Sequence, residues 1–166
     1  MPHGSLKLRP IVDEDSPSLY TIVRGVVAEG DTYVYPTSLT SDEARAPWVE
    51  APPGHTIVAD EHDEIVGTAK FGPKRPGRGS HVATASFMVP TDQRGRGVGR
   101  ALCNCVIAAA RDEGYAGMQF NAVVATNVGA IELYRTLGFV TIGTVPGAFD
   151  HVALGPVGLD TMYLAL

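Results

Sequence analysis

The sequence is short of cysteine, of aromatic residues and of long apolar runs. Only 2 of its 166 residues are cysteine, and 7% are aromatic. Cys103 and Cys105 lie two positions apart in an expected helix, where their side chains point to different sides and can neither pair nor share a metal. These counts exclude a disulfide scaffold, and both thiols are expected to be reduced.

Long apolar runs and an excess of positive charge are also absent. Stretches such as 105–110 fall far short of the ~20 residues that cross a bilayer, and the N-terminus lacks the apolar core of a secretion signal. The 13 basic and 18 acidic side chains give a formal charge of −5, whereas phosphate backbones require a basic face. We therefore expect a cytoplasmic protein without membrane or nucleic-acid partners, which binds a small molecule.

The residues that are present are sufficient for one globular core. The chain is 45% hydrophobic, and a chain of this size buries roughly two-thirds of the surface exposed when it is unfolded. There is no internal repeat and no linker long enough to divide it, so residues 1–166 are expected to form a single domain. Strands and helices interleave, which predicts an α/β (α+β) fold around a mixed sheet.

Periodicity predicts the order of elements. The expected order is a strand ending near Pro10, a helix ended by Gly30, a short helix opening at Ser41, a hairpin of strands 55–59 and 65–71, a strand 81–89, a helix ended by Gly114, a strand 118–125, a helix 127–137 and strands 139–143 and 161–166. The apolar face of the helix before Gly114 is expected to be Val98, Ala101, Leu102, Cys105, Val106 and Ala109. Residues 31–53, 73–80 and 144–160 are expected to be loop-rich.

A glycine-rich segment lies between a strand and the long helix. It reads Arg94-Gly95-Arg96-Gly97-Val98-Gly99-Arg100. Glycines allow a ligand to approach the backbone closely, and a helix N-terminus favours a phosphate or pyrophosphate. The segment lacks the Lys-Ser/Thr pair of a P-loop, and no acid lies in 114–121 to complete a dinucleotide fingerprint. A glycine-rich turn without a ligand stays the alternative.

Two motifs together resemble the GNAT superfamily of acyl-CoA N-acetyltransferases. The glycine-rich segment resembles that family's R-x-x-G-x-G/A pyrophosphate loop, and it follows Phe87-Met88-Val89 as the loop follows a splayed central strand. The segment 127–139 resembles the family's N-x-x-A-I-x-L-Y-x-x-x-G-F pattern. The resemblance implies a mixed, mostly antiparallel central sheet flanked by helices, and acetyl-CoA as co-substrate without a metal.

The resemblance also implies roles for individual residues. Backbone amides of 97–100 would hold the pyrophosphate, Phe87 to Val89 would pair with the pantetheine, Asn127 would bond the cofactor arm and Tyr134 would lie beside the thioester sulfur. A strand N–H of Met88 or Val89 can stabilise the oxyanion formed when an amine attacks the thioester, and a phenol can protonate the departing thiolate.

Each of these residues also has a structural interpretation. Tyr134 can pack beside Ile131, Asn127 can act only as a helix cap, and the three arginines can form a solvated face. The general base is open because the strand HVATASFMV holds no carboxylate. Thr84, Ser86 or His81 can order a water that takes the proton, or the amine can arrive neutral; His81 can equally be structural.

A narrower resemblance concerns the acceptor. The segments 120–127 and 143–146 resemble a GNAT subgroup that acetylates proline-like imino acids such as azetidine-2-carboxylate, which places Asn121 in the substrate pocket. The amide of Asn121 can donate to a carboxylate, although it can also bond neighbouring backbone. Relatives tend to carry asparagine where this chain has Thr84, so the substrate can differ.

These observations predict an enzyme that moves an acetyl group from acetyl-CoA directly to the amine of a small molecule, an amino acid or an analogue. The aromatic and Pro-rich segments 33–36, which includes Tyr35, and 144–159 predict a closed pocket around the substrate. A peptide or protein N-acetyltransferase and a non-catalytic acyl-CoA sensor are the alternatives. A homodimer is left open.

Overall fold

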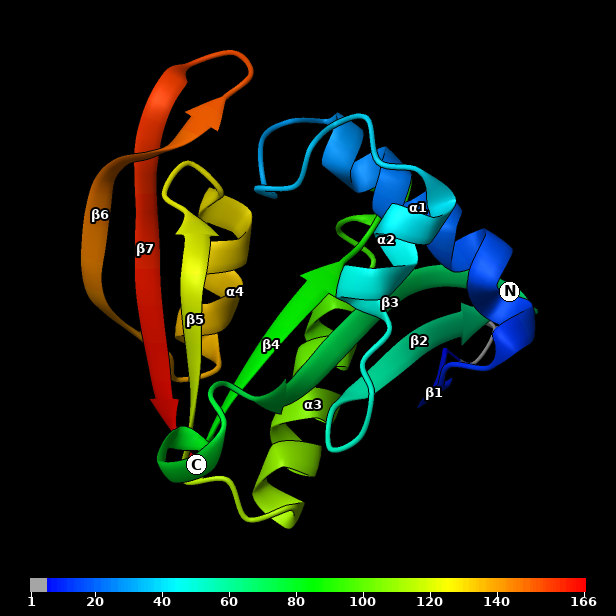
Figure 1. Cartoon of the computed structure of the whole chain (residues 1–166), viewed down its shortest axis with the longest axis horizontal. Coiled ribbons are helices and arrows are strands. Elements are labelled where there is room, and N and C mark those ends of the chain that lie inside the picture. Colours follow the sequence, from blue (N-terminus) through cyan, green and yellow to red (C-terminus); the bar gives the residue numbers. More distant parts are fainter. Residues whose placement is uncertain (1–5) are drawn as a thin grey trace.

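A seven-stranded sheet forms the middle layer of the protein (Figure 1), as seen in a computed structural model that describes residues 6–166. Residues 1–5, part of the predicted domain, lie outside the described residues. The strand order is β1-β2-β3-β4-β5-β7-β6. The strands are β1 Lys7–Pro10, β2 His55–Glu61, β3 Glu64–Pro73, β4 Val82–Met88, β5 Gly117–Val124, β6 Val140–His151 and β7 Gly155–Ala165. All neighbours pair antiparallel except β4 and β5. The predicted fold is confirmed.

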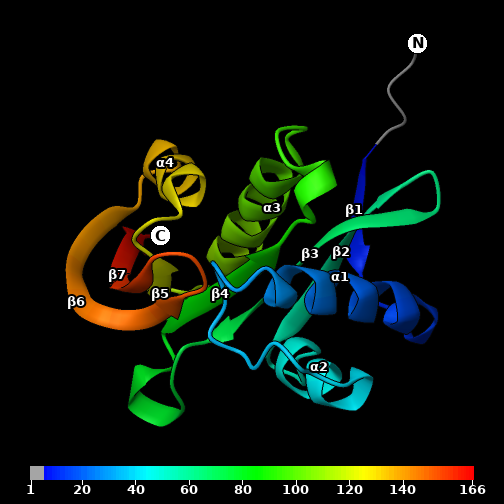
Figure 2. The same cartoon turned by 90° about the horizontal axis from the view of Figure 1, so that it is seen from above.

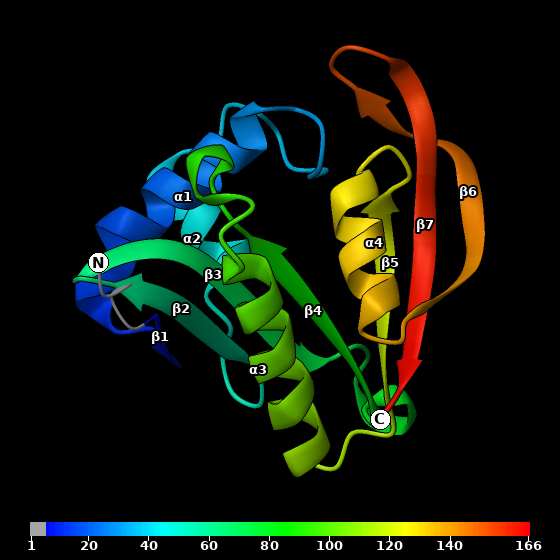
Figure 3. The same cartoon turned by 180° about the vertical axis from the view of Figure 1, so that it is seen from behind.

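Helices cover both faces of the sheet. Helices α1 (Ser16–Ala28) and α2 (Ser41–Trp48) lie on one face, and α3 (Val98–Asp112) and α4 (Val128–Thr136) lie on the other (Figures 2 and 3). The predicted apolar positions of α1 are buried at Leu19, Ile22, Val23, Val26 and Val27. Within residues 6–166, no helix is long and apolar enough to span a membrane.

The buried face of α3 differs from the predicted one. The buried side chains are Val98, Leu102, Cys103, Val106, Ile107 and Ala110. Cys103 rather than Cys105 therefore faces the sheet, because the stripe that packs on the twisted sheet runs toward the side of Cys103 and Ile107. The repeat of three and four residues was right, but its phase was wrong by about one position.

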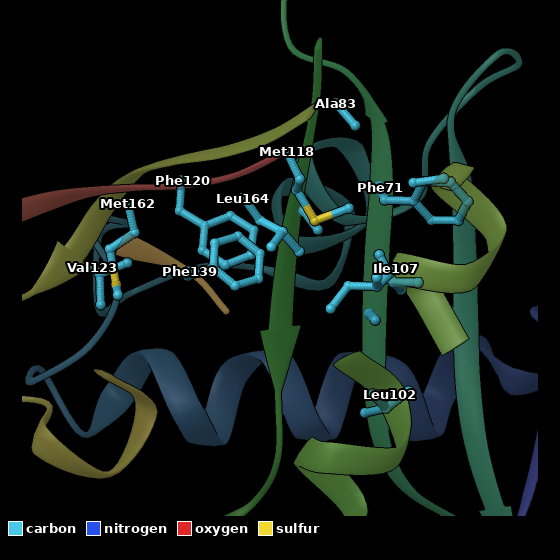
Figure 4. Packing of buried hydrophobic residues seen from close by; sticks show 14 of the residues in the cluster. Phe71, Ala83, Leu102, Ile107, Met118, Phe120, Val123, Phe139, Met162 and Leu164 are labelled. Atoms are coloured by element: carbon cyan, nitrogen blue, oxygen red, sulfur yellow. The ribbon is translucent and has the colours of Figure 1, made fainter. Parts of the chain in front are cut away.

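The core on the α3 side joins both halves of the sheet (Figure 4). Phe120 of β5 stacks on Phe139, with ring centroids 4.5 Å apart, and Met162 of β7 packs beside them. Met118 and Leu164 extend this cluster toward Ile107 of α3. The packing fixes α3, α4 and the last three strands relative to one another.

The central parallel pair separates after its first residues. Strand β4 pairs with β5 only where Val82 and Ala83 lie opposite Gly117 and Met118. Beyond Ala83 the two strands diverge, as Figure 1 shows. The predicted splayed central strand is therefore present, and it leaves strand edges that no neighbouring strand occupies.

The loop predicted over 144–160 is wrong. Strand β6 continues to His151, β7 begins at Gly155, and the two form a long hairpin. Pro146 and Gly147 suggest a break, but they lie in an irregular stretch where the register shifts between Val145 and Phe149. A bulge of this kind accommodates such residues without ending the pairing.

The first hairpin is tighter than predicted. Strands β2 and β3 extend to Glu61 and Glu64, so the turn is only His62 and Asp63, with φ of 56° and 63°. Two central residues with positive φ are typical of the type I′ turns that fit the twist of paired strands. The hairpin was predicted at this place, and only the length of its turn was overestimated.

Candidate active site

A cavity of about 810 Å³ lies where β4 and β5 separate. Its lining comes from both faces of the sheet. On the α3 side it is lined by the first turns of α3 and α4, and on the α2 side by the α1–α2 loop, residues 50–54, the end of β3 and part of β4. A cavity that is lined from both faces can hold two molecules that meet in the gap between the strands.

The N-terminus of α3 opens the α3 side. Gly97 is the N-cap with φ of 87°, a left-handed conformation that favours glycine, and no side chain among the described residues caps it. The first intrahelical bond runs from Ala101 N to Gly97 O at 3.0 Å, so the N–H groups of the first turn have no partner in the helix. These amides suit an anionic group.

The predicted pyrophosphate segment contributes unequally to the cavity. Gly95, Gly97, Gly99, Arg94 and Arg100 line it. A Cβ at Gly99 would meet Leu133 at 3.7 Å and Val89 at 3.8 Å, so a longer side chain there would fill the space above the helix turn. The segment therefore fits the group that the resemblance implies.

Two members of the segment do not line the cavity. Val98 is buried at 4% exposure, and it lies under Gly67 of β3, whose Cβ would come within 2.8 Å of it. Arg96 pairs with Glu61 at 2.6 Å. Val98 can therefore bind a ligand only through its backbone N–H. The Arg96 side chain instead binds Glu61, at the end of β2.

Arg94 and Arg100 differ in the partners that their side chains bind. Arg94 pairs with Glu29 at 2.7 Å and bonds Val89 O at 3.3 Å. Arg100 bonds only the Thr136 hydroxyl, at 3.1 Å, and no acidic partner is found for it within residues 6–166. Arg100 is therefore the arginine best placed to meet a phosphate.

Tyr134 of α4 lies against the aromatic residues of the gap. Its ring is 4.9 Å from Phe120 and 6.2 Å from Phe87 between centroids. Burial, and to a smaller extent Cys103, raises the pKa of the Tyr134 phenol above its usual value. The phenol therefore keeps its proton at neutral pH, which is the form that an acid requires.

The backbone of β4 is held from the α1–α2 loop. The Tyr33 hydroxyl donates to Phe87 O at 2.6 Å, and Tyr33 stacks on Tyr35 with centroids 5.9 Å apart. Because this carbonyl bonds a side chain instead of a strand, the backbone at Phe87 faces the gap. Phe87, Met88 and Val89 all line the cavity, and their pairing with the pantetheine stays a prediction.

Cys103 also lines the cavity, which the sequence did not indicate. Burial raises the pKa of its thiol to about 12. The thiolate is the nucleophilic form of cysteine, so this thiol is held in its unreactive state. Its environment supports direct transfer without a covalent carrier.

Asn127 has the structural role that was one of its two interpretations. Its Oδ1 accepts from Ala130 N at 3.3 Å and caps α4. Asn127 also lines the cavity, so a contact with the cofactor arm is compatible with capping and stays a prediction.

The α2 side of the cavity has a polar floor. In the antiparallel register Lys70 lies opposite Ser86, and Gly72 lies opposite Thr84, so these side chains share one face of the sheet. Gly72 has no side chain because the Cα of Gly54 would lie 3.0 Å from its Cβ. Thr84 lines the cavity beside Gly72, whereas His81 is exposed and does not line it.

Asn121 lines the cavity at a point where the regular alternation of β5 is interrupted. The register of β5 on β7 shifts between Phe120 and Val123, so Asn121 is exposed while Val123 is buried. Gln119 donates to Asn121 Oδ1 at 2.7 Å. Within residues 6–166 the NH₂ of Asn121 has no hydrogen-bond partner, so it can donate to a ligand.

The predicted closure of the pocket is right for one segment and wrong for the other. Tyr33 and Tyr35 line the cavity, but no residue of 144–159 does. Instead, the tip of the β6–β7 hairpin contacts the end of α1, where Val152 N donates to Gly30 O at 3.1 Å. The β6–β7 hairpin therefore contacts the start of the loop that contains Tyr33 and Tyr35.

Sequence reasoning missed Glu50, Lys70 and Lys74, all of which line the α2 side. Lys70 pairs with Glu50 at 3.0 Å and lies over Trp48, 5.6 Å from the ring centre. Lys70 in the strand IVGTAKFGP and Lys74 directly after it, at the same alternation, were the available indication. Glu50 lies in an irregular segment and gave none.

Comparison with known proteins identifies the class. Residues 22–139 match the model of the Acetyltransferase (GNAT) family. Because the match covers more than half of the chain, the protein belongs to this family, and the resemblance seen in the two motifs is confirmed.

Individual relatives agree with this assignment. A solved GCN5-related N-acetyltransferase from Kribbella flavida is 47% identical, with 97% of this chain and 98% of that chain covered and a TM-score of 0.93. The L-amino acid N-acyltransferase MnaT of Escherichia coli is 33% identical over 61% of this chain and 61% of its own length. N-acetyltransferase aca1 of Schizosaccharomyces pombe is 34% identical over 59% of this chain and 47% of its own length.

The chain covers about half to three-fifths of the length of these two curated relatives. An acetyltransferase from Salmonella typhimurium, solved with its cofactor acetyl-CoA, shares the fold at 24% identity, with 98% of this chain and 94% of that chain covered and a TM-score of 0.82.

Proposed function

We propose that the protein transfers an acetyl group from acetyl-CoA directly to the amine of a small molecule, an amino acid or an analogue. The observation that carries the proposal is the cavity through the β4–β5 gap, which has free helix amides on one side, a polar floor on the other and the protonated Tyr134 near the gap. The family assignment supports the same reaction.

Acetyl-CoA would enter from the α3 side. The first-turn amides of α3 and the Arg100 guanidinium would bind its phosphates, and the backbone of Phe87 to Val89 would align the pantetheine. The bound thioester supplies the activated acetyl group.

Residues of the gap would then assist the transfer. The backbone N–H of Val89 would donate to the carbonyl oxygen as negative charge develops there. Met88 lies opposite Thr68 in the same alternation as the bonded pair Lys74 and Val82, so its N–H points to β3 instead. The Tyr134 phenol would give its proton to the departing sulfur.

The proton of the acceptor amine needs a separate route. Glu50 is the one carboxylate among the described residues that line the cavity, and Lys70 already neutralises it. Thr84 and Ser86 share the polar floor, so we propose that they order a water that accepts the proton, or that the amine binds neutral.

An amino-acid-like acceptor is supported by Asn121 and by two relatives. The free NH₂ of Asn121 can donate to a carboxylate. MnaT is named an L-amino acid N-acyltransferase, and a relative from Pseudomonas paraeruginosa, 35% identical over 54% of this chain and 52% of its own length, is named an L-methionine sulfoximine/L-methionine sulfone acetyltransferase. Proline-like imino acids belong to the same acceptor class.

The test is thiol release from acetyl-CoA with a panel of free amino acids, sulfoximine and imino acids included. For an accepted amino acid, Asn121→Ala should lower kcat/KM roughly 10- to 150-fold, because a donor to a charged group contributes about 1.5–3 kcal/mol. The corresponding amine without the carboxylate should be affected much less. Equal losses for both acceptors would remove the argument from Asn121, and no release with any acceptor would contradict the proposed function.

A further inference from the structure

Lys74 is a cation of the cavity that the proposed chemistry does not use. It follows β3 and lines the cavity on the α2 side. Its N–H donates to Val82 O at 2.7 Å, so it continues the antiparallel pairing of β3 with β4 by one residue. Lys70, Gly72 and Lys74 alternate along the chain, which puts Lys74 on the same face as Lys70.

The two lysines of this face differ in their partners. The Lys70 ammonium bonds Glu50 and the Pro47 carbonyl. For the Lys74 ammonium, residues 6–166 offer neither an ion pair nor a hydrogen bond. Lys74 is only half-buried, yet burial is the main cause that lowers its pKa, with a further contribution from Arg75. A partly desolvated ammonium without a partner is unfavourable unless a ligand supplies the opposite charge.

The charges of the α2 side point to the sign of that ligand. Its described lining contains Lys70, Lys74 and Glu50 as charged groups, and Glu50 is neutralised by Lys70. The remaining charge is positive, and Lys74 lies two positions after Gly72, the register partner of Thr84, on the same face of the sheet. An acceptor with a negative group would complement this site, whereas a basic peptide tail would be repelled.

We infer that Lys74 binds the carboxylate, or an equivalent anionic group, of the acceptor and thereby selects small anionic amines over neutral or basic ones. The inference rests on the proposed acetyltransferase function and assigns its substrate class. Lys74 acts here in specificity, since it binds the acceptor at a distance from the reacting nitrogen.

The test compares Lys74→Met with the wild type. The methionine keeps an unbranched stem and removes the charge. The acceptors are free amino acids and their carboxamides, which share the amine and the side chain and differ in the negative group. Arg78→Met is the matched control, because it removes one positive charge from the exposed loop that follows β3 and lies outside the cavity lining.

For the amino acid that the wild type acetylates best, Lys74→Met should lower kcat/KM roughly 10- to 150-fold, mainly through KM. Turnover of the carboxamide should not change, which also shows that the variant is folded and retains its acetyl-CoA site. Arg78→Met should behave like the wild type with both acceptors.

Two results would overturn the inference and leave the proposed function standing. One is an equal loss for acid and carboxamide in Lys74→Met, and the other is no loss for either, in both cases with a wild type that acetylates amino acids. If the folded wild type releases no thiol with any acid or carboxamide, the proposed function itself fails, and the inference fails with it.

Discussion

The proposed role of Tyr134 as an acid depends on one atom, its phenol oxygen. Tyr134→Phe keeps the ring against Phe87 and Phe120 and removes only the proton donor. We expect kcat to fall roughly 10²-fold with little change in the Kd of acetyl-CoA, which is the usual range for the loss of a general acid. Single-turnover kinetics and calorimetry measure the two quantities, and an unchanged chemical step would reduce Tyr134 to a packing residue.

The environment of Tyr134 also predicts a pH dependence. Because burial raises the pKa of the phenol above its ordinary value of about 10, the acid form persists as the pH rises, and it is lost only above that value. We therefore expect kcat to show no alkaline decline due to this group below about pH 10. A decline near pH 8 that disappears in Tyr134→Phe would contradict the assignment.

The positions of single residues on the cavity could be predicted from the sequence where one motif contains those residues. Asn127 and Tyr134 belong to one helix, so their spacing alone places the cap and the phenol on the cavity. Glu50 and Lys74 come from separate segments, and only the contact of residues 50–54 with β3 brings them to one side of the cavity. A linear pattern contains no information on that juxtaposition.

Among the elements, the first turn of α3 is the one that we predict to bind the phosphates of acetyl-CoA. Gly99→Val places two methyl groups beyond a Cβ that itself has only ordinary contacts. The variant should fold, and the Kd of acetyl-CoA should rise by roughly tenfold or more, about 1.4 kcal/mol. Calorimetry measures this change.

Gly25→Val is the control for Gly99→Val. Gly25 lies within α1 and is exposed, and an added Cβ there would have no atom within 4 Å. It should bind acetyl-CoA as the wild type does. Wild-type affinity in a folded Gly99→Val would remove the α3 N-terminus from the site.

At the element scale, the long periodic helices and the splayed strand were predictable, and the last hairpin was not. Pro146, Gly147 and Gly155 are typical of loops, but pairing of β6 with β7 continues on both sides of the irregular stretch. The register shift between Phe120 and Val123 was likewise not predicted within the strand 118–125. Local propensity yields to pairing with neighbouring strands in both places.

For the molecule as a whole, a network of ion pairs links β1 to other elements of the fold. The Arg9 guanidinium bonds Asp15 at 2.7 Å and Asp60 at 3.1 Å, linking β1, the start of α1 and the β2–β3 hairpin. Arg9 holds the pKa of the Asp15 carboxyl below its usual range, and the N–H of Val12 adds to this effect.

This network predicts a pH dependence of stability. Because the pKa of Asp15 is lower in the folded state, its contribution is complete above the unfolded value of about 4 and is lost as the pH falls through the folded value. Asp15→Asn should lower the free energy of unfolding at pH 7 by about 1–3 kcal/mol and flatten its decrease toward pH 3. Urea unfolding across this range measures both, and parallel curves for the two proteins would contradict the prediction.

The most direct measurement follows the acetyl group itself. The protein is incubated with acetyl-CoA, a mixture of free amino acids and a peptide with a free N-terminus, and mass spectrometry locates the acetyl group. We predict acetylation of the amine of one or a few free amino acids, with the peptide and the protein unmodified. Acetylation of the peptide alone, acetyl held covalently on Cys103, or no acetyl transfer at all would contradict direct transfer to a small amino-acid-like acceptor.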